Sequence, residues 1–182
     1  MIRLFVAISI PEEARLPLSM ICSGPPGAKW VAPENYHLSL RFIGEVDYGM
    51  AEDIDFALSE IRAPGFSLKI SGVGFFGKGE KARILWAGTE PLDPLDHLQS
   101  KVDSALVRVG VPAESRRFSP HITLARLKRP DPVRLDAYVG EHAGFRAGPF
   151  PVDRFFLYSS FLSSSGAIYT QEVEYPLSPG IF

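Results

Sequence analysis

Tyr36-His37-Leu38-Ser39-Leu40 has a counterpart in Pro120-His121-Ile122-Thr123-Leu124, and both segments read histidine, aliphatic, hydroxyl, leucine. His121 follows His37 by 84 residues. Successive side chains of a β-strand point to opposite faces, so each segment would present an imidazole and a hydroxyl on one face while its aliphatic side chains enter a core. The repetition predicts a duplicated unit, folded so that the two faces meet across a cleft.

The composition fits one domain with a substantial hydrophobic core. The chain has 182 residues, 46% of them hydrophobic, and a formal net charge of −2. This charge argues against a surface that coats nucleic acid through many phosphate contacts, but it leaves room for a small site that binds one phosphate group. Cys22 is the only cysteine, which excludes an internal disulfide and a cysteine-based metal cluster.

The expected location is the cytoplasm. No segment approaches the roughly 20 apolar residues that a membrane span needs, and the N-terminal residues lack the pattern of a signal peptide. A single cysteine also suits a reducing compartment. We therefore expect no association with a membrane, and the sequence points to no obligate protein partner.

Hydrophobic patterning predicts a mixture of strands and helices. Apolar or alternating runs between turn residues predict strands at 3–10, 36–43, 66–77, 83–90, 119–127, 150–162 and 167–177, with Gly44 ending the second of these. Helices are expected at 11–22, 50–61, 94–109 and 133–141. Short polar turns in the strand-rich segments, 78–81 and 163–166, predict two hairpins.

The order of these elements repeats. Strand, helix, motif strand, helix and hairpin are followed by helix, motif strand, short helix and hairpin. Hairpins mixed with helices favour an α+β fold over a wholly parallel sheet. We expect residues 1–182 to form one bilobal domain built from two diverged repeats, with two pseudo-symmetric lobes, each an antiparallel sheet with helices, enclosing a central cleft.

The two motif histidines are the candidate catalytic residues. Imidazoles titrate near neutral pH, so one can withdraw a proton from water while the other donates a proton to a leaving oxygen. The hydroxyls of Ser39 and Thr123 can hold the oxygens of a phosphate. Both capacities suit a cyclic phosphodiester, whose opening requires a proton on the leaving alkoxide and donors around the phosphoryl oxygens.

Other motifs add no cofactor. No G-x-x-x-x-G-K-[ST] loop is present, and the two motif histidines lack Asp, Glu or Cys at the spacing of metal ligands. We therefore expect neither a metal nor another cofactor. His97 and His142 have no matching neighbours and are expected to be structural or exposed.

The chain resembles the two-histidine phosphoesterases, and specifically the bacterial and archaeal RNA 2′,3′-cyclic phosphodiesterases that have long been called 2′-5′ RNA ligases. The resemblance covers most of the sequence and rests on segments in a fixed order: RLFVAISIP at 3–11, HLSLRFIGEV at 37–46, FSLKISGVGFF at 66–76, FSPHITLARL at 118–127 and FFLYSSFL at 155–162. One departure is Ser39, where such proteins more often carry threonine, and the hydroxyl is kept.

The resemblance implies a role for each motif residue. It makes His37 the acid that protonates the ribose O3′ leaving group and His121 the base that activates water, so that the product is a 2′-phosphomonoester. Ser39 and Thr123 would hold the phosphate. The expected partner is therefore an RNA or oligonucleotide that ends in a 2′,3′-cyclic phosphate.

The family also implies substrate contacts from Phe42 and Arg126, the residues five beyond each histidine. This implication conflicts with ideal strand alternation, because an odd step turns both side chains away from the imidazole face. Twist, a bulge or a strand end would be needed to bring them into the cleft. Arg41 has the parity to face the cleft, yet it is expected to be a solvated surface cation.

Three alternatives stay open, one of which is an adaptor whose cleft is vestigial. The same chemistry could act on another small cyclic phosphate or on a 2′-5′ linkage. A protein of a different class, a noncatalytic binder of RNA ends, could keep the pocket without turnover. Intact histidine and hydroxyl residues in both motifs favour the enzyme, because a binder needs donors but not a matched acid and base.

Overall fold

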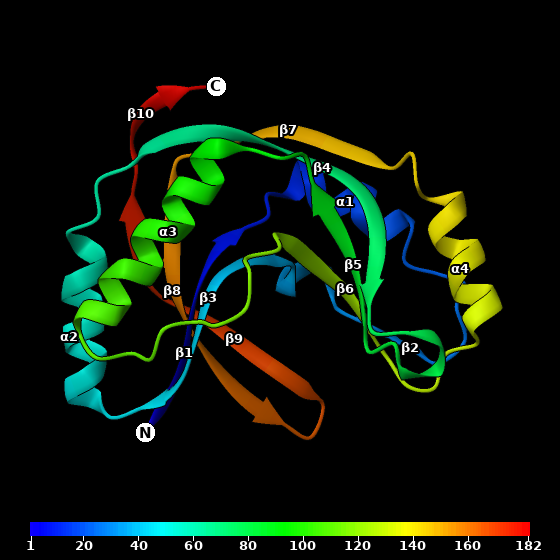
Figure 1. Cartoon of the computed structure of the whole chain (residues 1–182), viewed down its shortest axis with the longest axis horizontal. Coiled ribbons are helices and arrows are strands. Elements are labelled where there is room, and N and C mark those ends of the chain that lie inside the picture. Colours follow the sequence, from blue (N-terminus) through cyan, green and yellow to red (C-terminus); the bar gives the residue numbers. More distant parts are fainter.

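The computed structural model describes residues 1–182, apart from the side chain of Ile181, and the strands join in one curled sheet (Figure 1). The strands are β1 (Ile2–Ser9), β2 (Ala28–Trp30), β3 (His37–Val46), β4 (Pro64–Phe76), β5 (Ile84–Thr89), β6 (His121–Leu127), β7 (Arg146–Val152), β8 (Arg154–Ser163), β9 (Gly166–Pro176) and β10 (Ser178–Ile181). The helices are α1 (Glu12–Met20), α2 (Tyr48–Ser59), α3 (Asp93–Arg108) and α4 (Pro132–Glu141), with short 3-10 turns η1 (Pro33–Asn35) and η2 (Gly79–Lys81). The predicted α+β class is confirmed.

The strand order has a pseudo-symmetric centre. It runs β10-β4-β5-β6-β3-β1-β8-β9, with β2 beside β6 and β7 beside β4. The two motif strands, β3 and β6, meet in the middle, and β1 and β5 flank them. Figure 1 shows α2 and α3 together beside one half of the sheet and α1 and α4 beside the other half. The two predicted lobes are thus joined through one continuous sheet.

Strand β1 shows how the sheet divides its two faces. Leu4, Val6 and Ile8 enter the main core, which also contains the buried residues of all four described helices. Phe5 and Ala7 point to the opposite face and form a second, smaller cluster with aromatic residues of β8. Period-two alternation therefore places one face against helices and leaves the other for the cleft. None of the described helices is long and apolar enough to span a membrane.

Most predicted elements are confirmed within a few residues, and two predictions are wrong. Gly44 does not end its strand: its φ of +96° accommodates an irregularity in the β1 pairing, and β3 continues to Val46. The run 150–162 is two strands separated by Asp153, because residues before Asp153 pair with β4 whereas those after it pair with β1 and β9. The short strands β2 and β10 carry no alternation that the sequence could reveal.

The two motif strands touch at one residue pair. Leu38 of β3 pairs with Ile122 of β6 in an antiparallel register, and both side chains are fully buried in the main core. Their neighbours along each strand must point to the opposite face. This register sets His37 across from Thr123 and His121 across from Ser39 on the cleft face.

Both motif strands then contain a β-bulge at the third residue after the histidine. In β3, Arg41 pairs with Val6 and Ser39 pairs with Ala7, so Leu40 is the extra residue. In β6, Ala125 pairs with Leu85 and Thr123 pairs with Trp86, so Leu124 is the extra residue. An extra residue shifts the alternation by one position. As a result the fifth residue after each histidine returns to the face of that histidine.

Each bulge is held by a hydrogen bond from outside its own ladder. The Gln99 side chain on α3 donates to the carbonyl oxygen of Leu40 at 3.5 Å. The backbone N–H of Val31, directly after β2, donates to the carbonyl oxygen of Leu124 at 2.8 Å. Buried carbonyl groups need such partners, so both bulges are satisfied parts of the fold.

The bulge also corrects the expectation for Arg41. This side chain is 7% exposed, neither a surface cation nor a cleft residue. Its Nε donates to Asp103 Oδ1 of α3 at 2.6 Å, and its other nitrogens donate to the carbonyl oxygens of Phe42 and Pro112. Strict alternation assigned Arg41 to the cleft face. Because Leu40 is an extra residue, the Arg41 side chain points toward the helix-covered face instead.

Replacing Arg41 with alanine should destabilise the fold by about 3 kcal/mol, because Asp103 and two carbonyl groups lose a partly buried cationic partner. The free energy of unfolding from urea denaturation measures this loss. Arg134→Ala, which removes an exposed guanidinium from α4, is the control and should change that free energy by no more than about 0.5 kcal/mol. Equal losses in the two variants would contradict the structural role of Arg41.

Candidate active site

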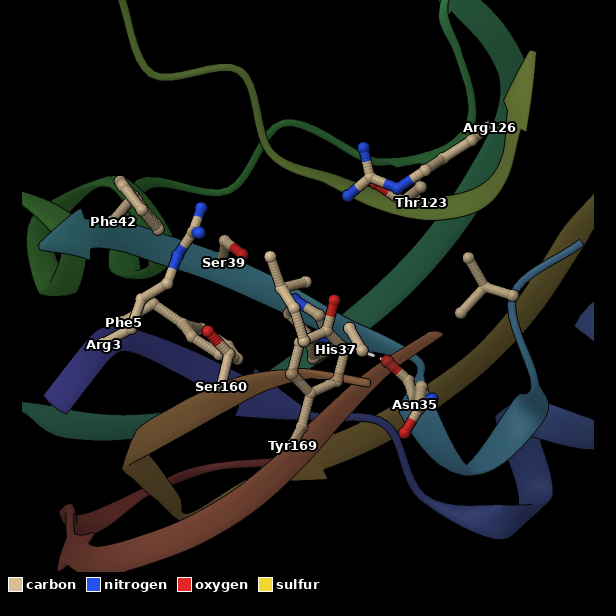
Figure 2. Close-up of a pocket in the computed structure, with 13 residues that line it drawn as sticks. Arg3, Phe5, Asn35, His37, Ser39, Phe42, Thr123, Arg126, Ser160 and Tyr169 are labelled. Carbon is tan, nitrogen blue, oxygen red and sulfur yellow. Dashed lines mark hydrogen bonds between the residues drawn. The ribbon is translucent and has the colours of Figure 1, made fainter. Parts of the chain in front are cut away.

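A cavity of about 240 Å³ lies on the face of the sheet opposite the helices (Figure 2). Five of the six predicted site residues line it: His37, Ser39, Phe42, Thr123 and Arg126. The other lining residues come from β1, η1, the segment after β2, and the β8–β9 hairpin: Arg3, Phe5, Val31, Asn35, Ser160, Leu162, Ala167 and Tyr169. The cavity therefore gathers residues from both ends of the sequence.

His37 is fixed where the η1 turn enters β3. Its Nδ1 lies 2.8 Å from the carbonyl oxygen of Asn35. The ring packs against Phe5, with centroids 4.9 Å apart, and meets Tyr169 edge-on at 5.1 Å. Burial lowers the pKa of His37, the hydrogen bond to Asn35 acts in the opposite direction, and positive charge on His121 lowers the pKa further.

His121 has the same anchor in the other lobe. Its Nδ1 lies 2.7 Å from the carbonyl oxygen of Ser119, again two residues before the histidine. Phe76 of β4 contacts the ring edge-on, with centroids 4.9 Å apart. Burial lowers its pKa, and the Ser119 hydrogen bond opposes this effect. His121 does not line the 240 Å³ cavity itself. The Leu38–Ile122 register nevertheless places it opposite Ser39, beside the same site, and its positive charge lowers the pKa of His37.

The two anchors give both imidazoles one tautomer. A carbonyl oxygen can only accept a hydrogen bond, so Nδ1 of each ring carries a hydrogen and donates it. The free nitrogen is then Nε2, which is a base when the ring is neutral and an acid when it is charged. One site thus holds two groups that can each take or give a proton at the same ring position.

Ser39 and Thr123 stand beside these rings on the cleft face. The structure records no protein partner for either hydroxyl among the described side chains, so both are available to a bound molecule. Thr123 lies directly across from His37 in the register around the Leu38–Ile122 pair. A hydroxyl can donate to an anionic oxygen, and such bonds are stronger than those between neutral groups.

Arg126 and Phe42 both reach the cavity, as the family resemblance implies and ideal alternation does not. Phe42 is 49% exposed despite its large apolar ring. The sequence prediction missed Arg3, whose Cζ lies 5.2 Å from the centroid of the Phe42 ring. Figure 2 shows Arg3 and Arg126 extending from β1 and β6 toward the same space.

The alternation of β1 could have revealed two of the missed lining residues, Arg3 and Phe5. Arg3 and Phe5 share one parity there, opposite to that of the core residues Leu4 and Val6. Once one face of β1 is assigned to the core, the other face must line the cleft. Tyr169 had no comparable signal, since β9 is exposed along most of its length.

The cavity is electropositive. Arg3 and Arg126 line it, and no described side chain in the lining carries a carboxylate. The described residues contain no group of three or more His, Cys, Asp and Glu placed to hold a metal ion. Two guanidinium groups, two hydroxyls and two imidazoles suit an anion that exchanges protons during its reaction.

Comparison with known protein families agrees with this chemistry. The family described as LigT like Phosphoesterase matches residues 8–86 and 88–169. The chain belongs to the LigT-like phosphoesterases.

Named relatives and solved structures of this family extend over nearly the whole chain. An RNA 2′,3′-cyclic phosphodiesterase of Thermotoga maritima is 35% identical over 92% of this chain and 91% of its own length. One of Archaeoglobus fulgidus is 33% identical over 92% of this chain and 96% of its own length. The crystal structure of E. coli LigT complexed with 3′-AMP is 29% identical, with a TM-score of 0.78, and covers 97% of this chain and 98% of its own.

The two non-motif histidines of this LigT-like phosphoesterase are structural or exposed, as the sequence predicts. His142 follows the last turn of α4, and its Nδ1 lies 2.8 Å from the carbonyl oxygen of Tyr138. His97 is exposed on α3. Neither lies in the lining of the cavity.

The lowered pKa values of His37 and His121 predict that stability decreases in mild acid. The folded state binds each of these protons more weakly than the unfolded chain does, whose histidines titrate near pH 6.5. The stabilisation is therefore complete above about pH 6.5 and is lost as the pH falls from there through the lowered pKa values.

Urea denaturation between pH 8 and pH 5 measures this dependence as the change in the free energy of unfolding. Replacing both His37 and His121 with glutamine should flatten the decline, whereas replacing the exposed His97 should leave it unchanged. An equally steep decline in the double variant would show that other groups cause it.

Proposed function

We propose that the chain hydrolyses RNA 2′,3′-cyclic phosphate ends to 2′-phosphomonoesters, with His37 and His121 as the catalytic pair and no metal in the reaction. The observation that carries the proposal is the matched geometry of the pair, in which each Nδ1 donates to a backbone carbonyl and each Nε2 stays free. Relatives named RNA 2′,3′-cyclic phosphodiesterase that match nearly the whole chain support the substrate.

Hydrolysis needs one proton removed and one proton supplied. In the proposed reaction His121 accepts a proton from water, whose oxygen forms a bond to phosphorus. The bond between phosphorus and O3′ breaks, and His37 gives its proton to O3′, so the phosphate stays on O2′. The two imidazoles are placed alike, and the family resemblance assigns the acid and the base.

The remaining cavity residues are proposed to bind the substrate. Ser39 and Thr123 donate hydrogen bonds to the nonbridging phosphoryl oxygens, where negative charge increases as water attacks. Arg126 adds a cation to the same region, and Phe42 offers an apolar surface to the ribose or base. The solved complex of E. coli LigT with 3′-AMP supports a site of nucleotide size in this fold.

Two broader features accompany this function. We propose a single domain built from two diverged repeats, which the separate matches of the family model to 8–86 and 88–169 support. We also propose a cytoplasmic location, for which the lone cysteine is the sequence argument.

Incubation of the protein with an oligonucleotide that ends in a 2′,3′-cyclic phosphate, in the presence of EDTA, should yield a 2′-phosphate. The reason is that two imidazoles supply both proton transfers, so no bound ion is required to activate water. Chromatography against 2′- and 3′-phosphate standards identifies the product. Loss of activity in EDTA with recovery on adding a divalent ion would contradict the metal-free reaction, and a 3′-phosphate would reverse the leaving oxygen.

Replacing His37 or His121 with alanine should lower kcat by roughly 10²–10⁴-fold, the usual contribution of a general acid or base. The double variant should lose less than the product of the single losses, because both groups serve one step. Binding of the cyclic end, measured by fluorescence anisotropy, should decrease less than turnover. Near-normal hydrolysis by either correctly folded single variant would support the noncatalytic binding role instead.

The pH profile separates the two roles. In the wild type kcat/KM should follow a bell whose maximum lies below about pH 6.5, since burial lowers both pKa values in the free enzyme. His37→Ala should remove the alkaline limb, which reports the acid, and His121→Ala should remove the acidic limb, which reports the base. Loss of the opposite limb in each variant would exchange the two assignments.

A further inference from the structure

The catalytic cavity continues into a second, larger hollow. This hollow has a volume of about 530 Å³ and shares Arg3, Asn35, Arg126 and Tyr169 with the cavity that contains His37. It extends to Lys29 and Trp30 of β2 on one side and to the turn of the β8–β9 hairpin on the other. A groove therefore leads away from the catalytic pair, between β2 and the hairpin.

The groove collects positive charge. Arg3, Lys29 and Arg126 line the larger hollow, and no described side chain in its lining is acidic. The whole chain has a formal net charge of −2, so this accumulation is local. The structure records no ion pair for any of the three among its described side chains.

The side chains of Lys29 and Arg126 repel each other when no ligand is bound. They are direct partners in the antiparallel pairing of β2 with β6. Like charges directly across a sheet destabilise it. A bound anion beside Lys29 would offset this repulsion and give the ammonium group an attractive contact.

The proposed reaction uses one anionic group, the cyclic phosphate beside His37 and His121. A cyclic phosphate closes the 3′ end of an RNA, so the rest of the strand can extend only from the 5′ side of that nucleotide. Its first internucleotide phosphate is then the nearest further anion. The groove continues directly from the cavity, and Tyr169 and Leu162 in its lining give it apolar surface against which a base can pack.

We propose that Lys29, opposite Arg126, binds the internucleotide phosphate directly 5′ of the cyclic end, so that the preferred substrate is an oligoribonucleotide and not a free cyclic nucleotide. This inference rests on the proposed function and adds a second phosphate subsite to it. Lys29 acts in binding and takes no part in the proton transfers.

The test compares three substrates that share one reacting group. They are adenosine 2′,3′-cyclic phosphate, a diadenosine dinucleotide with the same cyclic end, and that dinucleotide with a neutral methylphosphonate linkage. For the wild type, KM for the charged dinucleotide should be roughly three- to tenfold lower than for the neutral one. In Lys29→Gln the two dinucleotides should have KM values within about twofold of each other. Lys101→Gln, on α3, is the charge-matched control and should keep the wild-type ratio.

Salt dependence gives a second measurement. Removing one phosphate contact should reduce the slope of log KM against log salt concentration by about 0.7 for the charged dinucleotide. Equal KM values for the charged and neutral dinucleotides in the wild type, or an unchanged ratio in Lys29→Gln, would overturn the subsite. If the wild type hydrolyses none of the three, the proposed function fails, and dissociation constants for the same substrates then test the subsite independently.

Discussion

The extra residue in each motif strand is the constraint on which the site depends. Without Leu40 and Leu124 as extra residues, strict alternation would send Phe42 and Arg126 away from the motif histidines. The bulges return both side chains to the cleft, and the bulge in β3 points the Arg41 side chain toward the opposite, helix-covered face. Their carbonyl groups are satisfied from elsewhere in the fold, by Gln99 for one and by the backbone of Val31 for the other. Helix and loop packing therefore determines the shape of the cavity wall.

The matched surroundings of the two histidines follow from this arrangement. Each stands at the first position of its motif strand, and each donates to the carbonyl oxygen two residues earlier. This local hydrogen bond needs no distant residue, so the tautomer is determined where the chain enters the strand. The single Leu38–Ile122 pair then sets the relative position of the two motif strands where both imidazoles lie on the cleft face.

The sequence predicted the elements and the motif residues, because both depend on local patterns. Alternation and helical spacing located most strands and helices, and the repeated motif indicated His37 and His121 as candidate site residues. A bulge is invisible in such patterns, since the extra residue is defined only by the partner strand. This explains why alternation misplaced Arg41 and contradicted the family resemblance at Phe42 and Arg126. Arg3 was missed for a related reason: its role depends on which face of β1 the helices cover.

The differences between the two pseudo-symmetric motif strands can orient a substrate in the cleft. Equivalent bulges bring position five of each motif into the cleft, yet one lobe places the apolar ring of Phe42 there and the other places the cation Arg126. Lys29 lies beside Arg126, so two cations stand on the β2–β6 side of the cleft, whereas Arg3 alone stands beside Phe42. A cyclic phosphate at the end of a strand has its own two sides, with O2′ and O3′ as distinct possible leaving oxygens. In the proposed binding mode the rest of the strand runs toward the more positive side, so the ring binds in one direction, and this direction decides which leaving oxygen meets the imidazole that carries the proton.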